Sequence, residues 1–222
     1  MTRKFTIALS LLLSAGLLSS CFEVREKLHL KENGSGQFVY TLDFSQSQSA
    51  LSMAKMMADF RNKTSPDKKI KNSVDKTLEA LQSTDGISNA AVNRDDERFI
   101  YKVSFDFRDV ESLNAALNKF VKSEEEITFF TYDGKNFSRT DAVSIRQTIE
   151  KEMAHEGSSL SGLDPYELFS EATYVTDYSF EKTIKKAEVA GAATQDDHSI
   201  SAEHFIFSKD EAESLAQSVR LR

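Results

Sequence analysis

Few residues in this chain have the type and spacing that catalysis or metal binding requires. Glu152 and His155 lie three positions apart on an expected helix, the spacing of a Glu-x-x-His metal motif, but a di-iron site needs two such motifs. Asp196, Asp197 and His198 are adjacent and could ligate a cation, although three polar residues in a row are also ordinary loop composition. GxSxG, HExxH, P-loop, GxGxxG and CxxC patterns are absent. The sequence therefore assigns no catalytic residue, no cofactor and no metal site.

The single cysteine stands at the end of a secretory signal. Arg3 and Lys4 precede an apolar run of 14 residues, from Phe5 to Leu18, which has the length of a signal peptide and is short for a membrane span. Because Cys21 has no second cysteine to pair with, no internal disulfide can form. Cys21 therefore needs a role other than cross-linking.

The end of the signal, Leu18-Ser19-Ser20-Cys21, resembles the bacterial lipobox, in which an aliphatic residue and two small residues precede a cysteine. The resemblance implies that residues 1–20 are removed and that the thiol and amino group of Cys21 carry acyl chains. Two or three chains would hold the protein almost irreversibly, because each buried methylene contributes about 0.8 kcal/mol. Lipoproteins retained in the inner membrane often carry Asp after the cysteine, so Phe22 favours the outer membrane. An ordinary secreted protein whose signal ends in Cys is the alternative.

The charge of the chain excludes one class of partner. Its 222 residues are 40% hydrophobic and 28% charged, with a net charge of −7. Removal of residues 1–20 takes away Arg3 and Lys4 and no acid, which leaves 26 basic and 35 acidic residues and a charge of −9. Nonspecific binding of nucleic acid is not expected, because it needs a basic face to neutralise phosphates. Membrane attachment should depend on the acyl chains, since anionic lipid would repel such a protein.

One local group of residues is a candidate ligand or partner surface. Three methionines and Phe60 recur at helical spacing and form an apolar stripe, and a basic cluster follows them. The methionines could line a pliable groove or form ordinary core, and the basic residues could face lipid headgroups, an acidic partner or only solvent. The members of this surface are Met53, Met56, Met57, Arg61, Lys63, Lys68, Lys69 and Lys71.

Alternation of apolar and polar residues predicts that the folded domain starts almost at the lipid. Residues 22–30 alternate as a half-buried strand, Asn33-Gly34-Ser35-Gly36 supplies a turn, and residues 38–44 alternate again. Further helices are expected at 49–61, 70–81, 110–121, 144–155, 165–172 and 209–217. Hairpins are expected at 87–107 and 127–139, and single strands at 173–180, 184–189, 200–207 and 219–221. A polar loop should fill 62–69.

These elements predict one α+β domain over residues 21–222, with a largely antiparallel sheet built from hairpins and helices packed on one face. A subdivision near 143–160 is an alternative. The units at 22–61 and 87–121 share the order strand, turn, strand, helix, which suggests an internal repeat. A lipobox followed at once by a strand, the NGSG turn and a second strand resembles the LppM-type lipoprotein domain in organisation. That resemblance carries no site residue across.

The leading interpretation is an outer-membrane lipoprotein that acts as a non-enzymatic binding or envelope-assembly module, with an envelope protein or a lipid as its partner. One alternative is a carrier of lipid or another apolar ligand, held between the sheet and the methionine helix. A second is an Asp/Glu-dependent envelope hydrolase. A cleft with two carboxylates of raised pKa would favour the hydrolase, an apolar groove the carrier, and a flat apolar patch a protein partner.

Overall fold

The first hairpin follows from the alternation of apolar and polar residues. β1 (Glu23–Leu30) and β2 (Gly36–Asp43) pair antiparallel over their whole length. Gly34 in the turn has a φ of +85°, a conformation that a residue with a side chain rarely adopts. Its N–H donates to the carbonyl oxygen of Lys31 over 3.0 Å and closes the turn.

The computed structural model describes residues 22–60, 64–121, 126–141, 146–147, 150–151, 166, 169–190, 192–208 and 214–222. The lipobox, Glu152 and His155 therefore lie outside the described residues, as do most of the expected helix at 144–155 and part of the one at 165–172. No helix in the described part is long and apolar enough to cross a bilayer.

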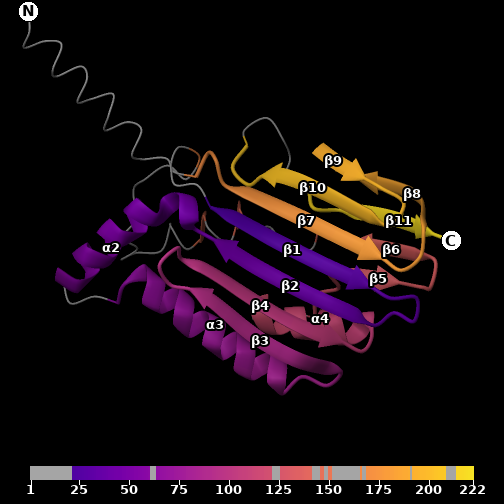
Figure 1. The fold of residues 1–222 in the computed structure, drawn as a ribbon, viewed down its shortest axis with the longest axis horizontal. Helices are drawn as coiled ribbons and strands as arrows, with labels where there is room; N and C mark the ends of the chain where they lie inside the picture. Colours follow the sequence, from indigo (N-terminus) through magenta and orange to yellow (C-terminus); the bar gives the residue numbers. More distant parts are fainter. Residues whose placement is uncertain are drawn as a thin grey trace, which may run out of the picture.

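Two sheets form the body of the described domain (Figure 1). The larger, of seven strands, has the order β3-β4-β2-β1-β7-β10-β9, and only the β1–β7 pair is parallel. The smaller, of four strands, is antiparallel in the order β5-β6-β11-β8. The remaining strands are β3 (Ile87–Asp95), β4 (Ile100–Phe107), β5 (Phe130–Tyr132), β6 (Asn136–Arg139), β7 (Thr173–Phe180), β8 (Ile184–Val189), β9 (Ala192–Gln195), β10 (Ser199–Phe205) and β11 (Gln217–Leu221).

Both sheets combine strands from the two halves of the chain. β1 pairs with β7 in the larger sheet, and β6 pairs with β11 in the smaller one. The strands on either side of residues 143–160 are therefore hydrogen-bonded to each other in both sheets.

Helix α4 (Val110–Val121) and the smaller sheet cover one face of the larger sheet (Figure 1). Asp109 caps α4 by accepting a hydrogen bond from the Ser112 N–H at 2.8 Å. Helix α3 (Pro66–Gln82) packs against β3 and α4. This arrangement confirms the predicted α+β class. Helix α2 (Gln48–Phe60), which follows the short 3-10 helix η1 (Ser45–Ser47), packs against α3 and η1 instead.

Aromatic rings fill the space between the layers. The Phe38 ring lies 5.4 Å from that of Phe105 within the larger sheet and 6.2 Å from that of Phe130 in the smaller one. Phe137 contacts Tyr178 and Phe180 with centroids 5.5 and 5.2 Å apart. A second, smaller apolar cluster lies at the end of the sheet where β1 begins, and its members are Phe22, Val24, Ala172, Tyr174, Ile206, Phe207 and Leu215.

Several sequence predictions of local structure are wrong at their edges. Helix α3 begins at Pro66, inside the expected loop, because proline fits the first helical position and Ser65 stands before it as the N-cap. Within the hairpin expected at 87–107, Phe99 has a φ of +57° and belongs to the turn between β3 and β4. Gln217 opens β11 and pairs with Arg139 and Val189, so the expected helix 209–217 does not extend to its end. Strand β9 was not expected.

Candidate functional site

The predicted methionine surface is exposed where the structure describes it. The exposed fraction is 67% for Met56 and 91% for Phe60, one helical turn further along α2. The core alternative is therefore wrong for Met56 and Phe60. Met53 and Met57 lie on α2, but their side chains are not among those described, and Arg61, Lys63 and Cys21 lie outside the described residues altogether.

The described lysines of the basic cluster lie in the first turns of α3. Lys68 and Lys69 are exposed, whereas Lys71 forms an ion pair with Asp96 at 2.9 Å. Asp67 is buried and 3.6 Å from Lys55 of α2. Burial alone would raise the pKa of Asp67, but the nearby Ser65 hydroxyl and the charge of Lys55 bring it below its usual value. The structure therefore brings Lys68 and Lys69 next to α2 and assigns Lys71 a structural partner.

Asp196, Asp197 and His198, which could have ligated a cation, form a turn in the structure. Asp196 accepts hydrogen bonds from the N–H groups of His198 and Ser199 and from the Ser199 hydroxyl, at 2.6–2.7 Å. The Ser199 hydroxyl bond and the His198 N–H bond lower the pKa of Asp196. His198 Nδ1 lies 3.2 Å from the carbonyl oxygen of Phe180. Within the described residues, no three His, Cys, Asp or Glu side chains are placed to hold a metal ion.

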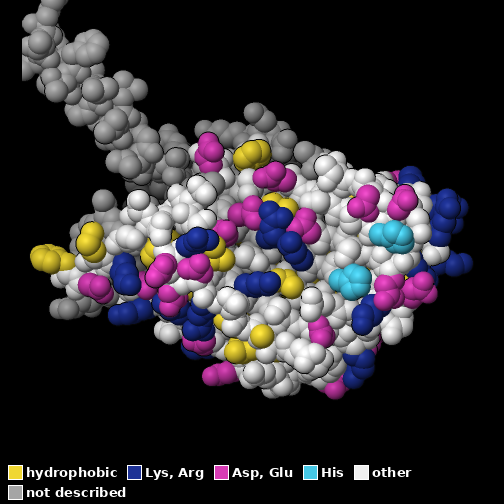
Figure 2. Space-filling model, in the orientation of Figure 1, with side chains coloured by type: hydrophobic (Ala, Val, Ile, Leu, Met, Phe, Trp, Pro, Cys, Tyr) yellow, Lys and Arg dark blue, Asp and Glu magenta, His cyan; other side chains and the backbone are white. Residues whose placement is uncertain are grey.

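The structure adds a polar surface that the sequence analysis did not single out. The outward face of the larger sheet carries Glu23, Arg25, Lys27 and His29 of β1, and no described helix or strand covers β1, β2, β7 and β10 on this side (Figure 1). Figure 2 shows charged side chains of both signs and histidines on this face. We call it the open face. A hollow of about 310 Å³ lies on it across β1, β2, β7 and β10. Its polar lining includes Lys27, His29, Gln37, Asp177, Ser179 and Ser201.

Asp177 organises the charges beside this hollow. It accepts a hydrogen bond from Arg25 at 2.7 Å and one from the Ser201 hydroxyl at 2.6 Å, and Lys27 Nζ lies 3.6 Å away. Burial would raise the pKa of Asp177, but the Ser201 hydroxyl and Arg25 bring it below its usual value. Asp177 is therefore a fixed negative charge at neutral pH, already paired with cations, and is poorly suited to move a proton.

His29 and Ser179 form a hydroxyl–imidazole contact in the same hollow. Ser179 Oγ lies 3.0 Å from His29 Nδ1 and 3.3 Å from the carbonyl oxygen of Leu28, to which it donates. A serine nucleophile must instead give its proton to the imidazole, with a third group orienting the base. The contact therefore suits recognition of a polar ligand better than acyl transfer.

A second polar group lies inside the domain, between the sheets. Glu26 of β1 and Arg139 of β6 are 4% and 6% exposed, and their Oε2 and Nη2 atoms are 3.3 Å apart. Tyr174 donates to Glu26 Oε2 at 2.5 Å, and Tyr178 donates to Oε1. Arg139 also donates to the Thr140 carbonyl oxygen at 2.6 Å. We call these four side chains the Glu26 cluster.

Electrostatics hold the protons on Tyr174, Tyr178 and Arg139 of the Glu26 cluster. Burial and the Glu26 charge raise the pKa values of Tyr174 and Tyr178 well above their usual value, so both hydroxyls remain donors. Burial would lower the pKa of Arg139, but the Glu26 charge raises it well above its usual value. Such a closed, fully paired group is a structural ion pair between two sheets, because it offers no free carboxyl oxygen to a substrate.

The signal for the Glu26 cluster was present in the sequence. Residues 22, 24, 28 and 30 form the apolar face of β1, and position 26 belongs to that same face, so its glutamate had to be buried. The partner could not be read from the sequence, because Arg139 lies 113 positions away. The hollow on the open face was missed for a similar reason, since it combines residues from four strands.

Comparisons with known proteins add little. No protein-family model matches the chain, and no curated protein matches it in sequence. One similar solved structure is the NMR structure of the folded domain of LppM from Mycobacterium tuberculosis. The TM-score is 0.45 and the sequence identity 10%, over 91% of each chain. This weak likeness assigns no role to any residue.

Proposed function

We propose that this protein is a lipoprotein of the bacterial cell envelope, held at the outer membrane by acyl chains on Cys21. In this proposal it acts as a non-enzymatic binding or envelope-assembly module. The observation that carries the proposal is the junction between lipobox and fold. Cys21 immediately precedes Phe22, whose ring is 6% exposed and lies 5.5 Å from those of Phe44 and Phe169. The domain therefore begins one residue after the lipidation motif.

The open face supports a binding role and suggests the chemistry of the ligand. The polar part of its lining consists of hydroxyl, amide, imidazole and charged groups, which recognise polar ligands or polar protein surfaces, and Leu28, Val39, Tyr178 and Ile200 complete the lining. Asp177 is already paired with Arg25 and Lys27, so a partner would not neutralise an unpaired charge there. It would form hydrogen bonds with the polar groups of the hollow.

The Glu26 cluster bears on the hydrolase alternative. A hydrolase of the Asp/Glu type needs two accessible carboxyl groups, one of them protonated near neutral pH. Glu26 is enclosed by Arg139, Tyr174 and Tyr178 in the interior. The pKa of Asp177 on the open face lies below its usual value, so it would not act as the acid. These observations favour the binding module.

Mass spectrometry on the native protein, extracted gently from membranes, tests the proposal. We expect a diacyl or triacyl mass on Cys21 and a copurifying envelope protein or polar ligand. Cys21→Ala should abolish lipidation and release the protein from the membrane fraction. An unmodified Cys21, or a Cys21→Ala protein that still sediments with membranes at high salt, would overturn the anchor.

Substitutions on the open face test the binding surface. Lys27→Glu should remove the copurifying species, because Lys27 lines the hollow. Lys102→Glu is the matched control: Lys102 is an exposed lysine of β4, on the same sheet but outside the hollow lining. Equal retention of the partner by both variants would remove the open-face hollow from the proposal.

A further inference from the structure

Three of the large hydrophobic side chains that the described structure exposes lie at the end of the sheet where the chain enters from Cys21. They are Phe60 and Met56 on α2, and Phe205 at the end of β10, with exposed fractions of 91%, 67% and 48%. Single exposed hydrophobic residues are common and need no explanation. Their position relative to the start of the domain is what distinguishes these three. The fourth, Val121, ends α4 and is 38% exposed.

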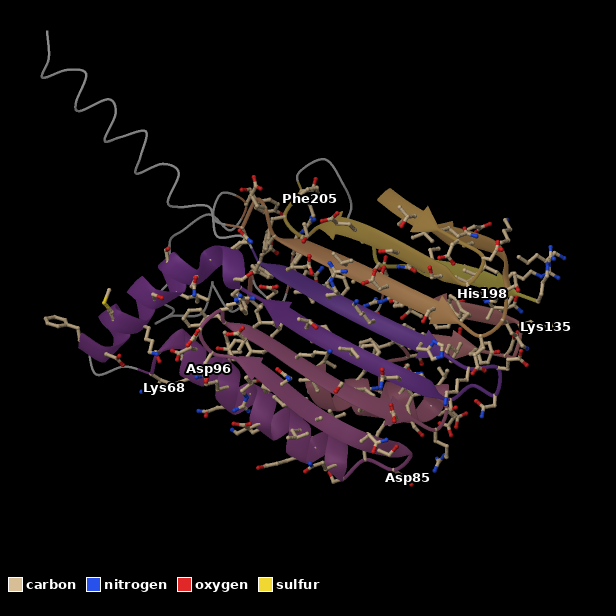
Figure 3. The ribbon with its side chains drawn as sticks, in the orientation of Figure 1. Lys68, Asp85, Asp96, Lys135, His198 and Phe205 are labelled. Carbon is tan, nitrogen blue, oxygen red and sulfur yellow. The ribbon has the colours of Figure 1, made fainter. Side chains whose placement is uncertain are left out.

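The strand register places Phe205 in the same row as the start of β1. Glu23 pairs with Thr173 of β7, and Thr173 pairs with Phe205 of β10. On the other side Glu23 pairs with Asp43, the last residue of β2, and η1 and α2 follow within five residues. Phe205 is thus two strands from Glu23, or about 10 Å. Figure 3 shows Phe205, α2 and Lys68 at this end and Lys135 and His198 at the other.

The lipidation motif leaves no tether between this end and the membrane. Phe22 is fixed in the fold, because its ring is buried and its carbonyl oxygen accepts the Thr173 N–H at 3.0 Å. One trans peptide unit spans about 3.8 Å, so an acylated Cys21 would hold the start of β1 at the level of the lipid headgroups. The surface next to Phe22 cannot leave the bilayer while the acyl chains are inserted.

Among the described residues, helix α2 is also covered less than its counterpart α4. In the second unit, α4 follows a hairpin and buries Leu113, Ala116 and Leu117 against the sheet. In the first unit, α2 follows a hairpin but packs on α3 and η1 and leaves Met56 and Phe60 in solvent. Because these residues are four positions apart, they share one side of the helix.

Positive charge accompanies the apolar residues, although the mature chain carries a charge of −9. Lys68 and Lys69 are exposed in the first turn of α3, next to α2, and within the described residues neither forms an ion pair. Lysines close to an anionic bilayer contribute about 1 kcal/mol each to attraction. Exposed apolar side chains with lysines beside them are the pattern of a surface that lies on lipid headgroups.

We propose that this end of the domain rests on the bilayer. Met56, Phe60 and Phe205 enter the interfacial region, and Lys68 and Lys69 lie over lipid phosphates. The inference rests on the proposed lipidation of Cys21 and adds an orientation to it. The strands of the larger sheet then run away from the membrane surface. The open face lies on the side of the domain and does not face the bilayer. Lys27, four residues beyond Glu23 along β1, lies about 13 Å from the start of the strand at about 3.3 Å per residue.

The absence of tryptophan from the chain allows a direct test. Single-tryptophan variants Phe60→Trp and Phe205→Trp are purified as the lipidated protein and reconstituted in phosphatidylcholine–phosphatidylglycerol vesicles with brominated acyl chains. Lys135→Trp, in the exposed β5–β6 turn at the other end, is the matched control (Figure 3). Bromine quenches tryptophan at short range, so residues buried about 5–10 Å into the interface should be quenched at least about twofold more than the control.

A charge-reversal arm tests the lysines. Adding Lys68→Glu and Lys69→Glu to Phe60→Trp should reduce quenching in vesicles with phosphatidylglycerol and leave it unchanged in pure phosphatidylcholine. Equal quenching at positions 60, 205 and 135 overturns the orientation, and protection of Phe60→Trp by a copurifying protein would assign this surface to that partner instead. The intact mass of the same sample separates the two proposals. Acylated Cys21 without preferential quenching removes only the orientation, whereas an unmodified Cys21 removes the anchor and the orientation with it.

Discussion

Arg139 reaches Glu26 from the opposite sheet, and the two side chains form a buried ion pair. Arg139 Nη2 and Glu26 Oε2 are 3.3 Å apart, and both side chains are less than a tenth exposed. The hydroxyls of Tyr174 and Tyr178 donate hydrogen bonds to the Glu26 carboxylate, and the Thr140 carbonyl oxygen accepts a further N–H from the Arg139 guanidinium. A buried charge is tolerated only when it is paired and hydrogen-bonded, and here every requirement is met by residues of β1, β6 and β7.

Breaking this pair should destabilise the domain strongly. Arg139→Met and Glu26→Met should each lower the free energy of unfolding by about 3–5 kcal/mol, because each leaves a buried group without its partner. The double variant should differ from the sum of the two by about 0.5–3 kcal/mol, as coupled residues do. Urea denaturation measures all three. Lys186→Met and Glu188→Met, an exposed pair on β8, form the control cycle and should be additive. Additivity at Glu26 and Arg139 would contradict the coupling.

The inward face of β4 should tolerate neither truncation nor charge. Phe105 is 1% exposed, and its ring lies 5.4 Å from that of Phe38 and 6.3 Å from that of Phe120. Phe105→Ala should cost about 3–5 kcal/mol of stability, and Phe105→Asp should unfold the domain, because it buries an unpaired charge. Phe60→Ala on α2 is the control, with an expected change within about 0.5 kcal/mol. A soluble Phe105→Asp protein with unchanged thermal unfolding would refute this core assignment.

The spacing of apolar residues predicted most of the helices and strands, because that spacing depends only on residues close together in the sequence. The 2-residue period of β1, β2 and β4 and the 3.6-residue period of α4 each report which side of one element is buried. Pairing between distant segments left no such trace. The parallel β1–β7 pair and the β6–β11 pair of the second sheet join residues more than 70 positions apart, so the expected antiparallel sheet lacked both pairs.

The candidate sites were harder to predict for the same reason. Met56 and Phe60 have the spacing of a core stripe, and only the position of α2 beyond the end of the sheet reveals that nothing described covers them. Lys71 belongs to a basic cluster in sequence but pairs with Asp96 in space. Asp177 and His29, on the open face, come from strands about 150 positions apart. The helical and strand periods of a sequence do not report which distant residues become neighbours in the fold.

A glycine at the start of β2 is required by close packing. A Cβ at Gly36 would lie 2.0 Å from the His29 carbonyl oxygen and 2.6 Å from Cζ of Phe107. Since one of these atoms is backbone, Gly36→Ala must displace β1 and should lower the melting temperature markedly. Gly134→Ala is the matched control, with a φ of +92° but no atom within 4 Å, and should cost only the strain of about 1–2 kcal/mol. Equal melting temperatures for the two variants would contradict the close approach.

The turn between β5 and β6 should make part of the stability depend on pH. Asp133 accepts hydrogen bonds from the side chain and N–H of Asn136 and from the N–H of Lys135, at 2.7–2.9 Å. These bonds lower the pKa of Asp133 from its usual 3.8 to about 2. Because the pKa is lower in the folded protein, the stabilisation is complete above pH 3.8 and is lost as the pH falls towards 2. Urea denaturation at pH 5 and pH 2.5 should therefore show a smaller loss of stability in Asp133→Asn than in the unmodified protein.

Asp59→Asn, at an exposed carboxylate on α2, is the control and should lose as much stability as the unmodified protein. If Asp133→Asn lost as much stability in acid as the unmodified protein, this turn would not contribute to the pH dependence of stability.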